Sequence, residues 1–195
     1  LVGIPLGLLA AIKPGGFLDF LLMGFAVFGV SMPVFWLGLI LMWFFGLEMS
    51  MFPLSGRLGI ELEYHATTGF LLWDSLLHAD WELLRSGLHH LILPAITLGT
   101  IPLAFLARMT RSAILDVMQQ DFIRTAKAKG MRKMLVYLKH ALKNAAIPIL
   151  NITALQFGSL LAGAMITETI FAWPGMGRWI LESVGGRDIP AIEGG

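Results

Sequence analysis

Side chains that could carry out metal or covalent chemistry are few in this sequence. Four histidines, His65, His78, His89 and His90, suggest a metal such as nickel, but no carboxylate or further histidine stands at ligand spacing on a shared helical face. Interfacial histidines are the alternative interpretation, and we predict no metal site. The chain has no cysteine, which excludes disulfides, thiolate ligands and cysteine nucleophiles.

Catalytic and nucleotide-binding motifs do not occur either. Ser159 and His90 are the nearest approach to a nucleophile and a base, but no Gly-x-Ser-x-Gly elbow surrounds the serine. The Gly-x-x-x-x-Gly-Lys-Ser/Thr loop that cradles phosphates is missing from the sequence. We therefore predict that the chain is not an enzyme, does not bind ATP itself and carries no cofactor.

Most of the positive charge lies in a basic segment from Arg108 to Pro148. It holds nine of the fourteen Lys and Arg residues, and only Asp116 and Asp121 oppose them. Long apolar segments lie on both sides, a pattern typical of a cytoplasmic loop, because Lys and Arg are retained on the inner face of a membrane. A solvated loop with its cations near lipid headgroups is an alternative that spacing alone leaves open.

Apolar residues within this basic segment recur at helical spacing on either side of Gly130. The first stripe is Ile114, Leu115, Met118 and Ile123, and the second is Met131, Met134, Leu135, Leu138 and Leu142. Glycine between two such stripes favours a helix end or a turn. The pattern predicts a helix, a turn at Gly130 and a second helix.

The rest of the chain must position this segment, and its composition points to a membrane. Hydrophobic residues make up 56% and charged residues 14%, whereas a soluble domain carries about 25% charged residues. We predict an all-α polytopic membrane protein. In order, its segments are a partial transmembrane helix (1–12), a transmembrane helix kinked at Pro33 (17–45), an external loop (46–87), a transmembrane helix (88–107), a cytoplasmic region (108–144), a transmembrane helix (145–167) with Pro148 in its first turn, and an external segment (168–195) with a short helix at Trp179–Val184.

Polar residues at membrane depth are the candidates for a transport pathway. Asn151 and Gln156 lie inside the last predicted span, where polar groups either line a pore or make interhelical hydrogen bonds. Glu168 at the end of that span is either a gate residue or an interfacial carboxylate. Trp173, Pro174 and Gly175 form a turn immediately after it.

Several stretches resemble one family of membrane proteins. Arg124-Thr125-Ala126, followed after three residues by Gly130, resembles the coupling motif of ABC-transporter permeases, although that motif has Glu-Ala-Ala in its simplest form. The longer runs 121–130, 109–112, 140–145 and 168–178 are similar to the dipeptide, oligopeptide and nickel branch, above all its dipeptide members. The resemblance implies a MetI-like helical bundle. The family's full chain has a helix before this region and another after it, so we expect a fragment without the first and last transmembrane helices.

The resemblance also implies a function and a set of partners. It implies a subunit of an ATP-driven importer in the bacterial inner membrane, forming half of a pathway for dipeptides. The partners would be a second homologous permease, two cytoplasmic P-loop ATPase subunits, an extracytoplasmic substrate-binding protein and the lipid bilayer, with no nucleic acid. Asp121 to Gly130 would dock on an ATPase, with Arg124, Thr125 and Ala126 as the contact face and Gly130 as the turn.

Other cargoes and another class of transporter are open alternatives. Nickel or longer oligopeptides would suit the same branch. An ATP-independent channel or secondary carrier would belong to a different class, and a carrier needs a coupling carboxylate near the middle of the membrane. No Asp or Glu lies deep inside the complete predicted spans.

Overall fold

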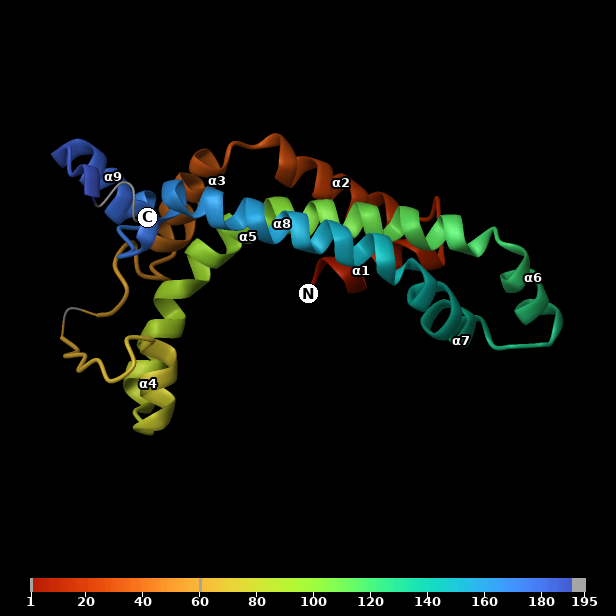
Figure 1. Ribbon diagram of the computed structural model, residues 1–195, viewed down its shortest axis with the longest axis horizontal. Helices are drawn as coiled ribbons and strands as arrows, with labels where there is room; N and C mark the ends of the chain where they lie inside the picture. Colours follow the sequence, from red (N-terminus) through yellow and green to blue (C-terminus); the bar gives the residue numbers. More distant parts are fainter. Residues whose placement is uncertain (1, 60, 191–195) are drawn as a thin grey trace. The chain divides into compact units, whose positions relative to one another are not determined.

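The computed structural model describes residues 2–59 and 61–190, apart from the side chains of 161–163. Within this described part the regular elements are helices, and it contains no strand (Figure 1). Residues 191–195 of the predicted external segment lie outside it. The elements are α1 (Gly3–Ile12), α2 (Phe17–Ser31), α3 (Val34–Leu41), the π-helix η1 (Met42–Glu48), α4 (Leu71–Leu77), α5 (Trp81–Met118), α6 (Asp121–Ala128), α7 (Lys133–Leu135), the π-helix η2 (Val136–Ala141), α8 (Leu142–Ile170) and α9 (Met176–Gly186).

The helices belong to two compact units. The first consists of Leu1–Met32 and Gly99–Leu161, and the second of Pro33–Leu98 and Ala162–Gly195. One boundary falls at Pro33, because a proline pushes the preceding residue out of the helical region. Met32 is accordingly extended, with φ −93° and ψ 133°. The predicted helix over 17–45 is therefore broken into α2 and α3, a larger interruption than the expected kink.

In the first unit, α1 packs directly on the inner part of α5. A Cβ atom at Gly3 would lie 2.8 Å from the carbonyl oxygen of Leu103, and one at Gly7 would overlap the carbonyl oxygen of Ala107. Small residues of this kind let two helix backbones approach closely, as is common between helices in membranes. Figure 1 shows α1 and α2 running alongside this part of α5 and the start of α8.

The core of the first unit gathers at the end that carries α6 and η2. Ile114 and Ile123 are completely buried there, together with Ala141 and Ala145. These residues come from α5, α6, η2 and α8 and also contact Ala11 of α1. The predicted basic segment is thus anchored by an apolar core beneath its charges.

Two long helices exceed their predicted bounds. α5 begins at Trp81 instead of residue 88 and continues to Met118, and α8 begins at Leu142 instead of residue 145. Pro148 lies inside α8 and not in its first turn, so the prediction for this proline was wrong. The predicted turn at Gly130 is confirmed by its positive φ of 73°, and the short helix predicted at Trp179–Val184 is confirmed as part of α9.

The helix after Gly130 exists, but only part of the predicted stripe faces the core, where Met131 and Leu142 pack. Met134, Leu135 and Leu138 are about half exposed, at 51%, 46% and 49%, whereas Val136 and Tyr137 are buried. Val136 and Tyr137 begin the π-helix η2, whose hydrogen bonds join residues five apart, so α-helical spacing does not describe its faces.

By length and apolar composition, α5 is the one helix in the described part that can cross a membrane alone. Two broken pairs of helices also pass that test when each is taken together. They are α2 with residues 34–48, and residues 133–160 with 164–170, which gives up to three spans.

Candidate functional site

The candidate docking element is α6, a short helix set off from α5 by a sharp break. Gln120 leaves the helical region, with φ −75° and ψ 152°, and serves as the N-cap residue of α6. Asp121 follows in the first turn, where a negative charge is favourable at the amino end of a helix. The break turns the chain, and Figure 1 shows α6 and α7 at the same end of the first unit.

α6 has one buried edge and one exposed face. Ile123 and Ala126 are three residues apart and lie in the core, with 0% and 6% of their surface exposed. Arg124 and Asp121 project into solvent, with 76% and 94% of their side-chain surface exposed, and are 3.4 Å apart at their nearest charged atoms. Phe122 is 39% exposed beside them. The result is a charged surface with one aromatic residue on a rigid apolar anchor.

Ala126 does not belong to the exposed face, so its placement in the contact face was wrong. The residue fits against the core formed by α5 and η2, where a larger side chain would separate α6 from its support. Arg124 and Thr125 remain exposed as predicted. Ala126 positions the element and does not present a surface to a partner.

Gly130 ends the α6 turn through its backbone conformation. Its φ is +73°, in the left-handed region that favours glycine. Its N–H donates to the carbonyl of Lys127 at 3.0 Å, and the N–H of Met131 reaches the carbonyl of Ala126 at 3.4 Å. These bonds satisfy carbonyls at the carboxyl end of the helix. No atom lies within 4 Å of a Cβ built on Gly130, so packing does not require glycine there.

The segment after Gly130 is tied to the end of α1. Tyr137 donates a buried hydrogen bond of 3.2 Å from its hydroxyl to the carbonyl of Ala11. The Lys133 ammonium donates to the carbonyl of Ile12, also at 3.2 Å. The last carbonyls of a helix lack partners within the helix, so these two side chains complete α1. Sequence reasoning missed both contacts because each joins residues more than a hundred positions apart.

The pore candidates fall in different parts of the chain. Asn151 and Gln156 lie on the part of α8 that belongs to the first unit, where Asn151 is exposed and Gln156 is half-buried. Glu168, Trp173, Pro174 and Gly175 belong to the second unit. The role of these residues in a pathway stays a prediction.

Glu168 has a structural contact that the sequence did not reveal. Its Oε2 atom accepts a hydrogen bond of 2.9 Å from the backbone N–H of Arg178, in the first turn of α9. The backbone N–H of Trp173 donates to the Glu168 carbonyl at 2.8 Å. A Cβ on Gly175 would overlap the Glu168 carboxylate. The turn is therefore wound closely around this carboxylate, which caps α9.

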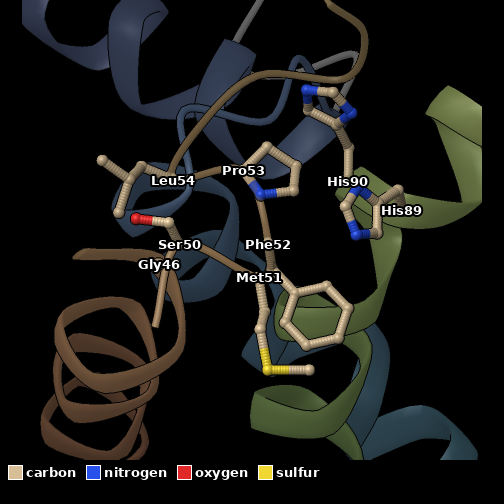
Figure 2. Close-up of a pocket in the computed structure, with 8 residues that line it drawn as sticks. All are labelled: Gly46, Ser50, Met51, Phe52, Pro53, Leu54, His89 and His90. Atoms are coloured by element: carbon tan, nitrogen blue, oxygen red, sulfur yellow. The ribbon is translucent and has the colours of Figure 1, made fainter. Parts of the chain in front are cut away.

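The histidines of the second unit face separate neighbours. Figure 2 shows His89 and His90 of α5 beside the loop 50–54, lining a cavity of about 460 Å³. The His89 ring lies 5.0 Å from the ring of Phe52, and His90 Nδ1 is 2.8 Å from the carbonyl oxygen of Ser86. His78 pairs with Thr67 at 2.9 Å. Within residues 2–59 and 61–190, no three potential metal ligands gather at one place.

Comparison with known proteins places the chain among transport components. A family described as "Binding-protein-dependent transport system inner membrane component" matches residues 3–195. The di/tripeptide transport system permease protein DppB of Pseudomonas aeruginosa is 48% identical over 99% of this chain and 57% of its own length. The dipeptide transport system permease proteins DppB of Escherichia coli K12 and Alkalihalophilus pseudofirmus are each 46% identical over the whole chain, and it covers 58% and 59% of them. The chain thus spans less than two thirds of these relatives.

Proposed function

Because the chain belongs to the family of binding-protein-dependent transport system inner membrane components, we propose that it is a permease subunit of an ATP-driven importer of dipeptides and short peptides. The names of the similar proteins from Pseudomonas and Escherichia support the cargo, since they specify di- and tripeptides or dipeptides. The chain would form half of the translocation pathway.

The observation that carries the proposal is the construction of α6. Its exposed face combines opposite charges with one aromatic residue, and its other edge is fixed in the core through Ile123 and Ala126. A partner that moves this face would move a rigid body, because the anchor is fully packed. We propose that the exposed face docks on a cytoplasmic P-loop ATPase.

The partner set follows from this assignment. The ATPase subunits would bind and hydrolyse ATP, so this chain would need no cofactor of its own. An extracytoplasmic binding protein would deliver the peptide, and a second homologous permease would complete the pathway. The bilayer would cover the apolar residues that are exposed on α2 and α8, such as Phe20, Phe25 and Leu155.

The contacts of α6 and η2 provide a route for coupling. Movement of α6 would be transmitted through Ile123 to α5 and α8, and through Tyr137 to α1. ATP binding by the partner would then shift the population between inward-open and outward-open states, because the partner binds one of them better.

Co-purification tests the docking proposal directly. The protein as its gene encodes it would be isolated in mild detergent with the variants Arg124→Glu and Arg85→Glu, and co-purifying proteins identified by mass spectrometry. Arg124 lies on the exposed face of α6, whereas Arg85 is an exposed arginine on the part of α5 predicted to be external. We expect a P-loop ATPase with the wild type and Arg85→Glu, and its loss with Arg124→Glu.

Two results would contradict the proposal. Equal recovery of the ATPase with all three proteins would remove α6 from the interface. A stable wild-type protein that recovers no ATPase at all would favour an ATP-independent channel or carrier.

A further inference from the structure

Two adjoining cavities in the second unit are both lined by Leu91 and Trp173. The larger, about 390 Å³, is also lined by Arg57, Phe70 and Pro174. The smaller, about 250 Å³, is lined on its other sides by residues of α5 and by Thr167 and Glu168 of α8. Cavities that bind small molecules commonly hold roughly 300–1,000 Å³ and combine apolar walls with a few polar groups. Both cavities have this composition and lie close to the lower end of that size range.

Arg57 supplies the positive end of this arrangement. Its guanidinium carbon lies 4.9 Å from the centroid of the Tyr64 ring, and the backbone beside it is fixed by a bond of 2.9 Å from the Gly56 N–H to the Phe171 carbonyl. Within the described residues, no carboxylate lies at ion-pairing distance from Arg57. A half-buried arginine in this position can bind a carboxylate through two parallel hydrogen bonds.

The smaller cavity supplies the opposite charge and an unpaired hydroxyl. Glu168 lies in its wall, with one carboxylate oxygen bonded to the N–H of Arg178. Thr167 is 4% exposed, and its Oγ1 atom has no hydrogen-bond partner. Leaving a buried hydroxyl unpaired is unfavourable, so a polar group of a ligand would be favoured beside it. A carboxylate and a hydroxyl both accept hydrogen bonds, and an ammonium group, with three N–H donors, is the ligand group that suits them.

We propose that the two cavities form one site for a zwitterionic short peptide, with its α-carboxylate on Arg57 and its α-ammonium at Glu168 and Thr167. Trp173 lies in both cavities and would contact the peptide between its two charged ends. The inference rests on the peptide transport proposed above and specifies how the permease itself recognises the cargo. It predicts that the permease recognises both the free amino group and the free carboxylate of the peptide.

Photo-crosslinking in the assembled transporter tests this site. A dipeptide with a diazirine side chain would be irradiated with the complex in lipid nanodiscs without the binding protein, and the labelled segment identified by mass spectrometry. Competitors would be dialanine, its C-terminal amide and its N-acetyl derivative. We expect labelling of the segment around Trp173, strong competition by dialanine, and competition at least 10-fold weaker by either blocked form, since a hydrogen bond to a charged group supplies roughly that factor.

Conservative variants assign each end of the peptide. Arg57→Gln should make dialanine and its amide compete equally, and Arg57→Lys should restore part of the difference. Glu168→Gln, which can still accept the Arg178 N–H and so keep α9 capped, should make dialanine and its N-acetyl form compete equally. Arg85→Gln and Glu82→Gln remove exposed charges from the start of α5 and should leave both differences unchanged.

The outcomes separate this inference from the proposed function. ATP-driven uptake of radiolabelled dialanine would be measured with the complete transporter and its binding protein. Uptake together with equal competition by all three peptides, or labelling confined to other segments, would overturn the site and leave the transport function intact. Failure of the wild-type transporter to take up any peptide would overturn both.

Discussion

Arg111 of α5 donates hydrogen bonds to both carboxylate oxygens of Asp19, each of 2.6 Å, and so fastens the start of α2 to α5. The Asp19 side chain is only 5% exposed, and its Oδ2 atom also accepts the backbone N–H of Gly15 at 2.8 Å. One carboxylate therefore fixes the turn after α1, the first turn of α2 and the carboxyl-terminal part of α5. An Arg–carboxylate pair of this two-bond form is both strong and geometrically specific.

Removing one charged group of this pair should lower the unfolding temperature more than removing both. Arg111→Gln leaves a buried carboxylate without its cation, a change that costs roughly 3–5 kcal/mol for a fully buried pair, and less here because the Arg111 side chain is 27% exposed. Asp19→Asn combined with Arg111→Gln keeps the hydrogen-bonding shape without charge. We expect the double variant to unfold at a higher temperature than Arg111→Gln alone, as measured by thermal unfolding in detergent.

A variant three residues away provides the control. Arg108 lies on the same helix and is exposed, so Arg108→Gln should change the midpoint little. If the losses in unfolding temperature of Arg111→Gln and of Asp19→Asn simply add in the double variant, the two side chains are not coupled.

Substitutions at Gly130 should reduce coupling to ATP hydrolysis in proportion to how poorly the new residue tolerates a positive φ. A side chain there meets no atom within 4 Å, so the cost is entirely in the backbone, about 1–2 kcal/mol for most residues and less for Asn. Peptide-stimulated ATP hydrolysis by the assembled transporter should therefore fall in the order glycine, asparagine, alanine, valine. Equal activity of Gly130→Asn and Gly130→Val would show that the turn conformation does not matter for coupling.

The sequence predicts helices well where apolar periodicity and glycine act locally. The helix and turn around Gly130 could be foreseen because a positive φ and a helix end both favour glycine. The π-helix η2 could not, because three- and four-residue spacing does not reveal the burial of Val136 and Tyr137 within it. The apolar pattern therefore predicted the helix and only part of its buried face, Met131 and Leu142.

Contacts between distant positions limited the prediction of the candidate sites. Asp19 and Arg111 are 92 residues apart, and nothing local to either predicts the partner. The burial of Ala126 also depends on the neighbouring helices. The sequence therefore placed Ala126 on the docking surface, whereas its small side chain packs in the core. The one carboxylate of the apolar helix α2, Asp19, was the signal that a buried cation must lie opposite it, but the sequence does not say which arginine.

The stability of the loop before α4 should depend on pH through the ionisation of Asp74. Burial acts to raise the pKa of this carboxyl, but hydrogen bonds from Thr68, Tyr64 and Thr67 outweigh it and hold the pKa well below its usual range. A lowered pKa in the folded state stabilises the loop above the unfolded value of about 4 and stops doing so as the pH falls through the folded value. Amide protection at Thr67–Gly69 should therefore be constant between pH 7 and pH 5.

Hydrogen exchange at several pH values measures this dependence. Below about pH 4 the protection of these amides should decline progressively in the wild type, because Asp74 then takes up a proton when the loop opens, and the closed loop with its ionised Asp74 loses its advantage. Asp74→Asn should show weaker protection at every pH and no decline. A decline of equal size in Asp74→Asn would assign the effect to another group.

Gly175→Ala should uncap α9, although its backbone conformation suits any residue. Its φ is −126°, so the restriction comes from crowding, because the new Cβ would overlap the Glu168 carboxylate. Displacing that carboxylate from the Arg178 N–H should cost about 0.5–2 kcal/mol, as the loss of a capping side chain does. Gly185→Ala is the matched change in the same helix, where a Cβ meets nothing within 4 Å and should strengthen the helix. Hydrogen exchange of the α9 amides should become faster in the first variant and slower in the second.

Combined with Glu168→Ala, Gly175→Ala should have almost no further effect, because the cap is already lost. A full additional loss in that double variant would mean that Gly175 is required for a reason other than its contact with Glu168.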